Sequence, residues 1–329
     1  MRLLRRVRVR AKAAAFDALS AAGLGGPFLR PRPGGRILVW HGLDHRGGSG
    51  FNARFVSAAR FEEQVADMKD RFHVVPLRDY FEGERHPSKL TVVLTFDDGY
   101  ESAATLALPI LERHGVPASF FVTAIRACGE EILWPDLLDA SAHLTDSPLA
   151  VAGERFVKDR RREWVSKRDG TPLKTRARRA DGDYLAGLVA ALRNVADVTS
   201  REELAVYWRT LSEEQVRRLA ESPLVTLGSH GRRHVSLGHA SREEAREEMA
   251  ASKEWLQRVS GRPVDALAFP DGSFREETLD DAEALGYRML LASDELPGGG
   301  RPSLRGRLTL NPFASLANQV RVIYSGTHG

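Results

Sequence analysis

Two adjacent acids at the end of an apolar run place the strongest constraint on what this chain can fold into. The run Leu90–Leu94 leads, two residues later, to Asp97, Asp98 and Gly99. This pattern is typical of a buried strand that ends in a tight turn. Two neighbouring carboxylates at a strand end are costly unless a cation, or a shared proton, separates their roles. The sequence therefore raises the question of which other residues could complete a metal site.

Short apolar runs alternate with amphipathic segments over much of the chain. Helical patterns occur at 61–70 and 100–114, and two capping-box sequences begin at Ser212 and Ser241. Strands that alternate with helices predict an α/β fold with a mostly parallel sheet or a barrel. The predicted strands are residues 36–40, 73–77, 90–94, 118–123, 224–227, 266–269 and 287–292.

One segment, residues 146–208, departs from this alternation. Its first half alternates charged and apolar residues and contains an Asp-Gly turn sequence, which predicts a β-hairpin on the surface. Residues 181–195 then follow a helical pattern. We therefore expect an insertion at about 146–208 within a domain of residues 36–325. A basic N-terminal segment and linker, residues 1–35, precedes that domain.

The positive residues are clustered, although the formal net charge is only +4. One cluster covers residues 1–12 and another covers residues 158–179. No zinc finger, RNA-recognition or helix-turn-helix pattern accompanies them, so we expect no nucleic-acid partner. The single cysteine, Cys128, excludes an internal disulfide and a thiolate metal cluster.

The N-terminal segment bears on localisation. No apolar run reaches the roughly 18 residues of a spanning helix, and residues 1–12 lead into no secretory core, which predicts a cytoplasmic protein. Residues 1–30 could form a basic amphipathic helix in peripheral contact with an anionic membrane. A solvated helix packed on the domain, or a frayed tail, is an equally good interpretation.

Two further groups of polar residues follow predicted strands, and a third precedes a late apolar stretch. His230 and His234 come after the strand 224–227, and they can face one cation if the turn between them is helical. Taken alone, two surface or core histidines would explain this pair better. The carboxyl ends of parallel strands converge, however, and histidine with carboxylate suits zinc and similar ions. The other two groups are Phe269-Pro270-Asp271-Gly272, which can also be a simple turn, and Arg305-Gly306-Arg307.

The order of these motifs resembles that of the polysaccharide deacetylase family, the NodB homology domain of carbohydrate esterase family 4. The resemblance covers roughly residues 36–145 and 211–325. It implies a distorted (β/α) barrel and a metal-dependent hydrolase of carbon–nitrogen bonds other than peptide bonds. The residues that carry it are Thr95-Phe96-Asp97-Asp98-Gly99, Ser229-His230 with His234, Phe269-Pro270 with Gly272, Val39-Trp40-His41, and Phe61-Glu62-Glu63-Gln64.

The resemblance also implies roles for single residues. Asp97 would be the general base, and Asp98, His230 and His234 would hold a divalent metal ion. Zinc is the first expectation for that ion, with cobalt, nickel, manganese or iron as alternatives. Arg307 would orient Asp97, although a surface ion pair is the competing interpretation. The remaining implied residues are the backbone N–H of Tyr100 for the oxyanion, with Pro270 and Gly272 at the substrate.

The general acid is where the sequence departs from the family pattern. Many members carry Leu-x-Leu-His near the C-terminus, and here Asn311 stands in place of that histidine. An asparagine side chain cannot donate a proton in that way. Either Asp97 serves as both base and acid, or another histidine enters the site. His41 is the first candidate, ahead of His239 and His328, and a purely structural His41 is an equal alternative.

These observations predict hydrolysis of the N-acetyl amide of an amino sugar. The expected substrate is a bacterial surface glycan or its lipid- or phosphate-linked precursor, since the basic segments favour anionic partners. One alternative is a deformylase or another non-peptide amidohydrolase on the same fold. Another is an inactive glycan-binding domain, which would have no need of the four motif residues Asp97, Asp98, His230 and His234.

Overall fold

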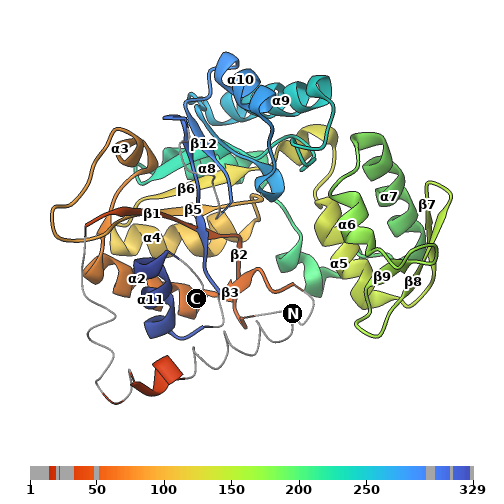
Figure 1. Ribbon diagram of the computed structural model, residues 1–329, viewed down its shortest axis with the longest axis horizontal. Coiled ribbons are helices and arrows are strands. Elements are labelled where there is room, and N and C mark those ends of the chain that lie inside the picture. Colours follow the sequence, from red (N-terminus) through yellow and green to blue (C-terminus); the bar gives the residue numbers. More distant parts are fainter. Residues whose placement is uncertain are drawn as a thin grey trace.

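A curled parallel sheet forms the core of the molecule. The computed structural model describes residues 15–19, 22, 33–47, 52–293, 301–311 and 314–326. The nine strands of the main sheet follow the order β13-β12-β11-β10-β6-β5-β1-β14, with β4 beside β5, and every pairing is parallel (Figure 1). The strands are β1 Gly35–Trp40, β4 His73–Val74, β5 Thr91–Phe96, β6 Ala118–Val122, β10 Val225–Ser229, β11 Ala266–Ala268, β12 Met289–Leu291, β13 Leu304–Arg305 and β14 Leu308–Thr309.

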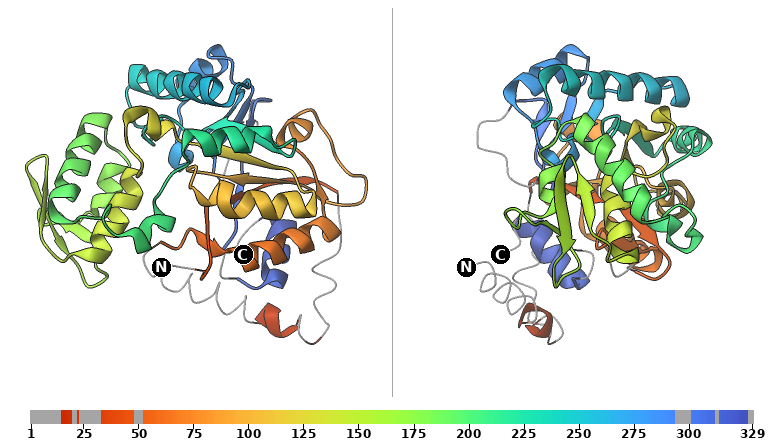
Figure 2. Two further views of the ribbon diagram at one scale, coloured as in Figure 1. Left: turned by 180° about the vertical axis from the view of Figure 1, so that it is seen from behind. Right: turned by 90° about the vertical axis from the view of Figure 1, so that its right-hand side faces the viewer.

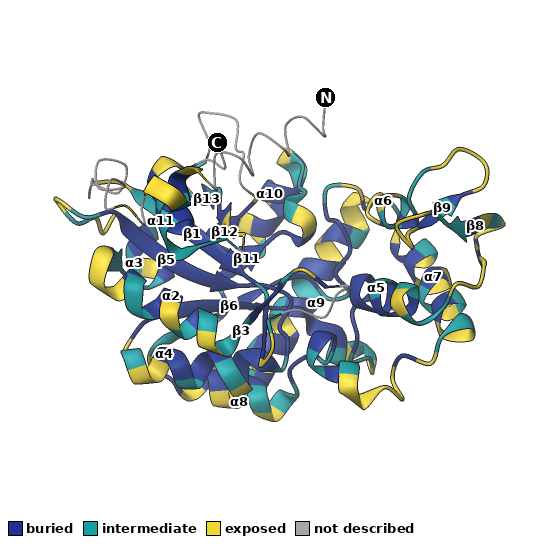
Figure 3. Ribbon diagram, turned by 90° about the horizontal axis from the view of Figure 1, so that it is seen from below, coloured by how far each residue is buried: buried dark blue, intermediate teal, exposed yellow. Residues whose placement is uncertain are grey.

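The predicted distorted (β/α) barrel is confirmed, in the form of an open half-barrel. Within the described part of the chain, the terminal strands β13 and β14 pair only with β12 and β1 respectively, so the sheet does not close. Each predicted strand is present with its bounds shifted by a few residues. The central strands of the sheet are mostly dark blue in Figure 3 because most of their residues are buried on both faces, as is typical of parallel sheets.

Helices cover the outside of the sheet (Figure 2). Both predicted capping sites begin helices, since Ser212 makes a complete capping box with Gln215 and the Ser241 hydroxyl accepts from the Glu244 amide. The surrounding helices are α2 Ala58–Arg71, α3 Leu77–Phe81, α4 Leu108–His114, α8 Glu213–Glu221, α9 Arg242–Ser260, α10 Glu276–Ala284 and α11 Leu316–Ser325.

The single helix expected over residues 100–114 is divided in two. A π-helical turn, η2 (Ala103–Ala107), precedes α4, and Pro109 lies in the first turn of α4 rather than at a mid-helix kink. The reason is that proline lacks an N–H and is best tolerated where a helix begins. Gly115, which directly follows the helical pattern of 100–114, ends α4 with a left-handed φ of 64°, a conformation that glycine adopts readily at helix ends.

Aromatic packing fixes the strand that carries the acids. Phe96, the last residue of β5, stacks on Phe120 of β6 with ring centroids 4.8 Å apart and on Trp40 of β1 at 5.9 Å. Such pairs contribute about 0.5–1.5 kcal/mol each beyond their burial. The residues that follow Phe96 therefore start from a rigid platform.

Residues 146–208, called the insertion lobe below, lie beside the core and pack on α5 (Trp134–Leu144). The predicted hairpin is larger than expected, because β7 (Leu149–Val151), β8 (Glu154–Lys158) and β9 (Trp164–Ser166) form a three-stranded antiparallel sheet. The rest of the lobe comprises α6 (Leu173–Ala177), α7 (Gly182–Val195) and η4 (Glu202–Tyr207).

The chain leaves the core before α5 and returns to it after the insertion lobe at one contact, called the neck below. Thr210 donates from its backbone N–H and its hydroxyl to the carbonyl of Glu131, at 3.1 and 3.0 Å. The next residue, Leu211, donates its N–H to the carbonyl of Gly99 at 2.9 Å. The neck therefore touches the turn that follows the acid pair.

None of the described helices is long and apolar enough to cross a membrane. Of the first 32 residues, only 15–19 and 22 are among those described, and His328 lies outside them as well. The predicted membrane contact of residues 1–30 and the boundary at residue 35 stay predictions.

Candidate active site

The turn after β5 aims the two acids at different partners. Asp98 and Gly99 both have left-handed backbones, with φ of 72° and 76°. A Cβ on Gly99 would lie 2.9 Å from Val122 Cγ1, so this position requires glycine on two grounds. A left-handed aspartate is uncommon and persists where its surroundings fix it, often at functional sites.

Asp97 is held by a buried arginine. Arg307 donates from its two Nη atoms to the two carboxylate oxygens of Asp97, each at 2.7 Å, and both side chains are buried. Its Nε donates to the carbonyl of Ala292 at 3.2 Å. Burial alone would raise the pKa of Asp97, but the Arg307 guanidinium outweighs it and holds that pKa below its usual value. Asp97 is therefore ionised at neutral pH, as a base must be.

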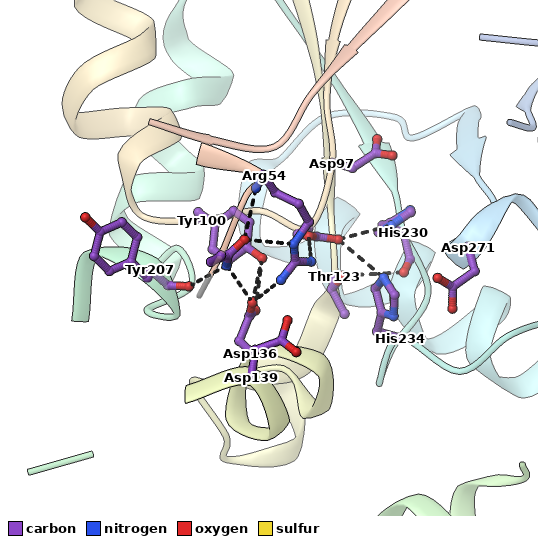
Figure 4. Close-up of polar contacts among 12 residues, drawn as sticks. Arg54, Asp97, Tyr100, Thr123, Asp136, Asp139, Tyr207, His230, His234 and Asp271 are labelled. Carbon is purple, nitrogen blue, oxygen red and sulfur yellow. Dashed lines mark hydrogen bonds and ion pairs between the residues drawn. The ribbon is translucent and has the colours of Figure 1, made fainter. Parts of the chain in front are cut away.

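Asp98 forms a compact cluster with the two histidines. Its Oδ1 lies 3.4 Å from Nε2 of His230 and 3.3 Å from Nε2 of His234, and the three ligand atoms lie within 4.8 Å of one another (Figure 4). Burial raises the pKa of Asp98, yet its contacts with both histidines hold that pKa well below the usual value.

The hydrogen bonding of this cluster fits a bound cation. Nδ1 of His230 lies 2.8 Å from the carbonyl of Ala268, which can only accept, so the ring proton of a neutral His230 sits on Nδ1. Its Nε2 then presents a lone pair to the Asp98 carboxylate, and two acceptors face each other. In addition, the buried Nδ1 of His234 has no hydrogen-bond partner among the described residues. A metal ion between these ligands would satisfy the facing lone pairs.

The segment that carries the histidines is not the helical turn that their spacing would need. It is a loop in which Gly231 has φ 76° and His234 has φ 59°. The buried carboxylate of Glu248 on α9 closes this loop, because its Oε2 accepts from the amides of Arg232 and Arg233 at 2.9 and 2.7 Å. Its Oε1 accepts from Nε of Arg233 at 2.7 Å. Glu248 thus fixes the backbone between the two histidines.

An arginine occupies the other oxygen of Asp98. Nη1 of Arg54 lies 3.0 Å from Asp98 Oδ2, and Nη2 pairs with the buried Asp136. The hydroxyl of Tyr100 donates to the same Asp136 carboxylate at 2.9 and 3.0 Å. Burial raises the pKa of Asp136 to about 7 although Arg54 opposes the shift. One oxygen of Asp98 therefore faces the histidines while the other is anchored to the protein (Figure 4).

A cavity of about 190 Å³ gathers most of the predicted site residues. Tyr100, Pro270, His239 and Asn311 are not among the described residues that line it, and Thr309 rather than Asn311 reaches it from the C-terminal strand. The predicted residues that do line it are His41, Asp97, Asp98, His230, His234, Gly272 and Arg307.

His41 is the remaining histidine of this wall. Of the described residues that line the cavity, the histidines are His41, His230 and His234, and the last two belong to the Asp98 cluster. Enclosure lowers the pKa of His41, while the carboxylates of Asp98 and Asp97 oppose the shift. At neutral pH His41 is therefore a neutral ring in the cavity wall, which can relay a proton that another group supplies. Tyr100 points its side chain at Asp136, so only its backbone N–H is available for the predicted role.

The comparison with protein families decides which family carries this arrangement. The family model described as polysaccharide deacetylase matches residues 84–143 and 189–290. The chain belongs to the polysaccharide deacetylase family. The matched segments contain Asp97, Asp98, His230 and His234, whereas His41 and Arg307 lie outside them. The unmatched residues between them are 144–188, and all but the first two belong to the insertion lobe.

Relatives of this family member include one curated protein and several solved structures. YxkH of Bacillus subtilis (strain 168), whose name assigns it to the polysaccharide deacetylases, is 32% identical over 79 residues, which span 24% of this chain and 28% of the relative. The Streptococcus pyogenes deacetylase PplD in complex with acetate has a TM-score of 0.56 at 17% identity and covers 89% of this chain and 99% of its own. IcaB from Ammonifex degensii has a TM-score of 0.54 at 18% identity, covering 89% and 97%. At these identities the two structures establish the fold alone.

Several residues of the site lie outside the sequence prediction. Glu248 could have been found, because the positions 245, 249, 252 and 256 of α9 define a buried face that includes residue 248. Arg54 and Asp136 carry no such signal, since a lone charged residue in a loop or a first helical turn is ordinary. Lys174 and Arg178, which also line the cavity, belong to a charged segment that is typical of an exposed surface.

As the pH is lowered, we expect the Arg307→Gln variant to lose activity at a higher pH than the unmodified protein does. The substitution leaves the buried Asp97 carboxylate without its counterion, so its pKa rises, by about one unit or more. Since Asp97 must be ionised to act as base, the acid limb of kcat/KM moves to higher pH by the same amount. An Arg305→Gln variant is the matched control, because Arg305 bonds the backbone carbonyls of Arg301, Pro302 and Leu304 instead. An unmoved acid limb in Arg307→Gln would contradict the assignment.

We expect the Glu248→Gln variant to bind metal more weakly. Supporting residues behind metal ligands typically contribute about 10–100-fold in affinity, and the substitution removes the charge that closes the histidine loop. Competition with a chelator measures this constant without reference to activity. Glu247→Gln is the control, because Glu247 is exposed and pairs with the side chain of Arg232. Equal metal affinities in Glu248→Gln and Glu247→Gln would show that Glu248 has no effect on the metal ligands.

Proposed function

We propose that this protein is a metal-dependent deacetylase of an N-acetylated amino sugar. The substrate is a bacterial surface glycan or its lipid- or phosphate-linked precursor. The observation that carries the proposal is that two adjacent acids contact different partners. Asp97 is ionised and held by Arg307, whereas Asp98 meets His230 and His234 in a cluster that fits a cation.

Asp98, His230 and His234 would hold the metal ion, for which zinc is the first choice. When bound, a divalent ion of this kind polarises an amide carbonyl and, for zinc, lowers the pKa of a bound water to about 7. Three protein ligands leave positions open for water and substrate, as catalytic sites require. Arg54 keeps the second oxygen of Asp98 occupied, which favours a single Asp98 oxygen as ligand.

The chain's own residues supply the proton transfers. Asp97 accepts a proton as water attacks the acetamide carbon, and Arg307 keeps both of its oxygens oriented during that step. The backbone N–H of Tyr100 donates to the developing oxyanion. The proton that Asp97 accepted passes to His41, whose ring is neutral at rest because its pKa is lowered, and His41 gives it to the sugar nitrogen as the C–N bond breaks. The products are acetate and the free amino sugar.

The role of His41 can be separated from that of Asp97 by the leaving group. We expect His41→Gln to slow hydrolysis of the sugar acetamide by about 10²-fold, because an amine leaves only after protonation. Hydrolysis of 4-nitrophenyl acetate, whose leaving group needs no proton, should change much less. A His239→Gln variant serves as control, since His239 bonds Ser236 and Ser273 outside the cavity. Equal losses on both substrates would exclude His41 as the acid.

Acetate release tests the function itself. The purified protein, loaded in turn with zinc, cobalt and nickel, is offered a set of N-acetylated and N-formylated amino sugars and their phosphorylated forms. Release of acetate that is absent from the Asp98→Ala variant supports the proposal. Release of formate alone would identify a deformylase, and no release from any substrate would overturn the proposal.

A further inference from the structure

A helix of the insertion lobe forms part of the wall of the active-site cavity. Leu173 and Ala177 of α6 are buried in the lobe, each with 1% of the residue exposed, and they fix this short helix in place. Lys174 and Arg178 are each one position further along and lie on the neighbouring helix face. Both line the cavity that contains the acid pair. The lobe therefore contributes two cations to a cavity whose candidate catalytic and metal-binding residues follow strands of the main sheet.

A second cavity continues from this wall. Its volume is about 490 Å³, and it lies between α5 and the insertion lobe. Three residues line both cavities, namely Arg54, Lys174 and Arg178, so the two spaces adjoin. Cations outnumber acids in its lining, which contains Arg54, Arg162, Lys174 and Arg178 against Asp139 and Glu163.

Lys174 of α6 and Arg178, the residue that follows α6, are positioned by ion pairs that leave them capacity for a ligand. Lys174 Nζ lies 2.6 Å from Asp139 Oδ2. Arg178 pairs through its Nε with Asp271 Oδ1 at 3.0 Å, and its side chain is 52% exposed. Within the described ranges, the two Nη groups of Arg178 have no acceptor. The guanidinium of Arg178 is therefore held through Nε, while its two Nη groups are available to a ligand. Two such N–H groups side by side can bind two oxygens of one phosphate.

Asp271 helps to hold this arrangement across the cleft. It lies in the turn after β11 with a left-handed φ of 54°, and it lines the same cavity. Figure 4 shows Asp271 beside His234 on the core side of the site. The Arg178–Asp271 pair therefore connects the lobe to the core at the cavity and sets the guanidinium at the boundary between the two spaces.

We propose that the two cavities form one cleft in which Lys174 and Arg178 bind a phosphate group attached to the sugar that is deacetylated. The inference rests on the proposed deacetylase function and adds the chemical class of its substrate, an N-acetylated sugar phosphate or phosphodiester. In this arrangement the acetamide group of the substrate lies near the cluster of Asp98, His230 and His234. Its phosphate group lies beside Lys174 and Arg178. Uncharged glycosides lack the group that this wall recognises.

Calorimetric titration of the metal-free protein with inorganic phosphate tests the binding site without any sugar. We expect the dissociation constant to rise about tenfold in Arg178→Gln and in Lys174→Gln, because each loses a charge-assisted contact. The matched control is Arg168→Gln, an arginine of the same lobe whose side chain is 71% exposed and lines neither cavity. Phosphate binding that is absent, or that is equal in all four proteins, overturns the proposal.

Kinetics with three forms of the sugar found by acetate release then distinguish the sources of the phosphate. The forms are the methyl glycoside, the 1-phosphate and an alkyl phosphodiester that represents a lipid-linked sugar. We expect kcat/KM to favour the phosphorylated forms by about tenfold or more, and Arg178→Gln to remove most of that preference. A preference for the phosphodiester over the monoester identifies the lipid-linked source. Equal rates on all three forms overturn this inference but leave the deacetylase, whereas phosphate binding without acetate release from any sugar of the earlier screen overturns the deacetylase alone.

Discussion

Replacement of Asp97 by asparagine is expected to lower kcat for acetamide hydrolysis by about 10⁴-fold while the metal remains bound. Loss of a general base costs about 10²–10⁴-fold, and the upper end applies here because no other carboxylate of the cavity is free of the metal cluster or an ion pair among the described residues. Metal affinity should be preserved because Asp97 contacts Arg307 rather than the histidines. Rate measurements with chelator competition on the same preparation check both statements.

The substitution also leaves Arg307 as a buried charge without a counterion, which can cost about 3–5 kcal/mol of stability. A second variant that carries Asp97→Asn together with Arg307→Met removes both charges. We expect the double variant to regain thermal stability and to remain as inactive as the single one. An Asp97→Asn enzyme with a tenth or more of the original kcat would refute the assignment of Asp97 as base.

Removal of one metal ligand is expected to have the second largest effect. His230→Ala or His234→Ala should each lower kcat/KM by about 10³-fold or more, because carbonyl polarisation by a metal ion contributes several kcal/mol and each 1.4 kcal/mol is tenfold. A readout independent of activity is the stabilisation by added metal. A ligand present at 100 times its dissociation constant stabilises the folded state by about 2.7 kcal/mol, and the variants should lose that shift in melting temperature.

The matched control for these variants is His239→Ala. His239 is a nearby histidine that accepts or donates hydrogen bonds with Ser236 and Ser273 and does not line the cavity. It should keep both the activity and the metal-dependent shift. Metal stabilisation that survives in His230→Ala and His234→Ala would mean that the cation binds elsewhere, and the ligand assignment would be wrong.

The strands and the main motif residues could be predicted because their causes are local. An apolar run followed by Asp97-Asp98-Gly99 encodes a strand and a turn in neighbouring residues, and parallel topology then brings strand ends together. The same reasoning located His230 and His234 next to Asp98 without knowledge of the loop between them. A helical turn between them, the condition under which their spacing would let them face one cation, is not present. Glu248 of α9, 14 residues after His234, stabilises a different loop backbone instead.

The parts that could not be predicted depend on contacts across long sequence distances. Arg54 reaches Asp98 and Asp136 from a loop, and no periodic pattern marks it. The prediction for Asn311 illustrates the same limit. Its position in the motif is clear from the sequence, yet only the fold shows that Thr309 reaches the cavity and that His41 lines it from the end of the neighbouring strand β1.

The neck at Thr210 and Glu131 has an evolutionary consequence. A chain that departs and returns at one hydrogen-bonded point can lengthen, shorten or replace the insertion lobe without changing the register of the sheet, while α5 stays with the core because its Asp136 pairs with Arg54. The acid pair, the histidines and Arg307 all belong to the part that stays, whereas Lys174 and Arg178 belong to the part that can be exchanged. A new glycan specificity can therefore evolve by replacement of the lobe sequence, while the residues proposed to carry out hydrolysis stay unchanged.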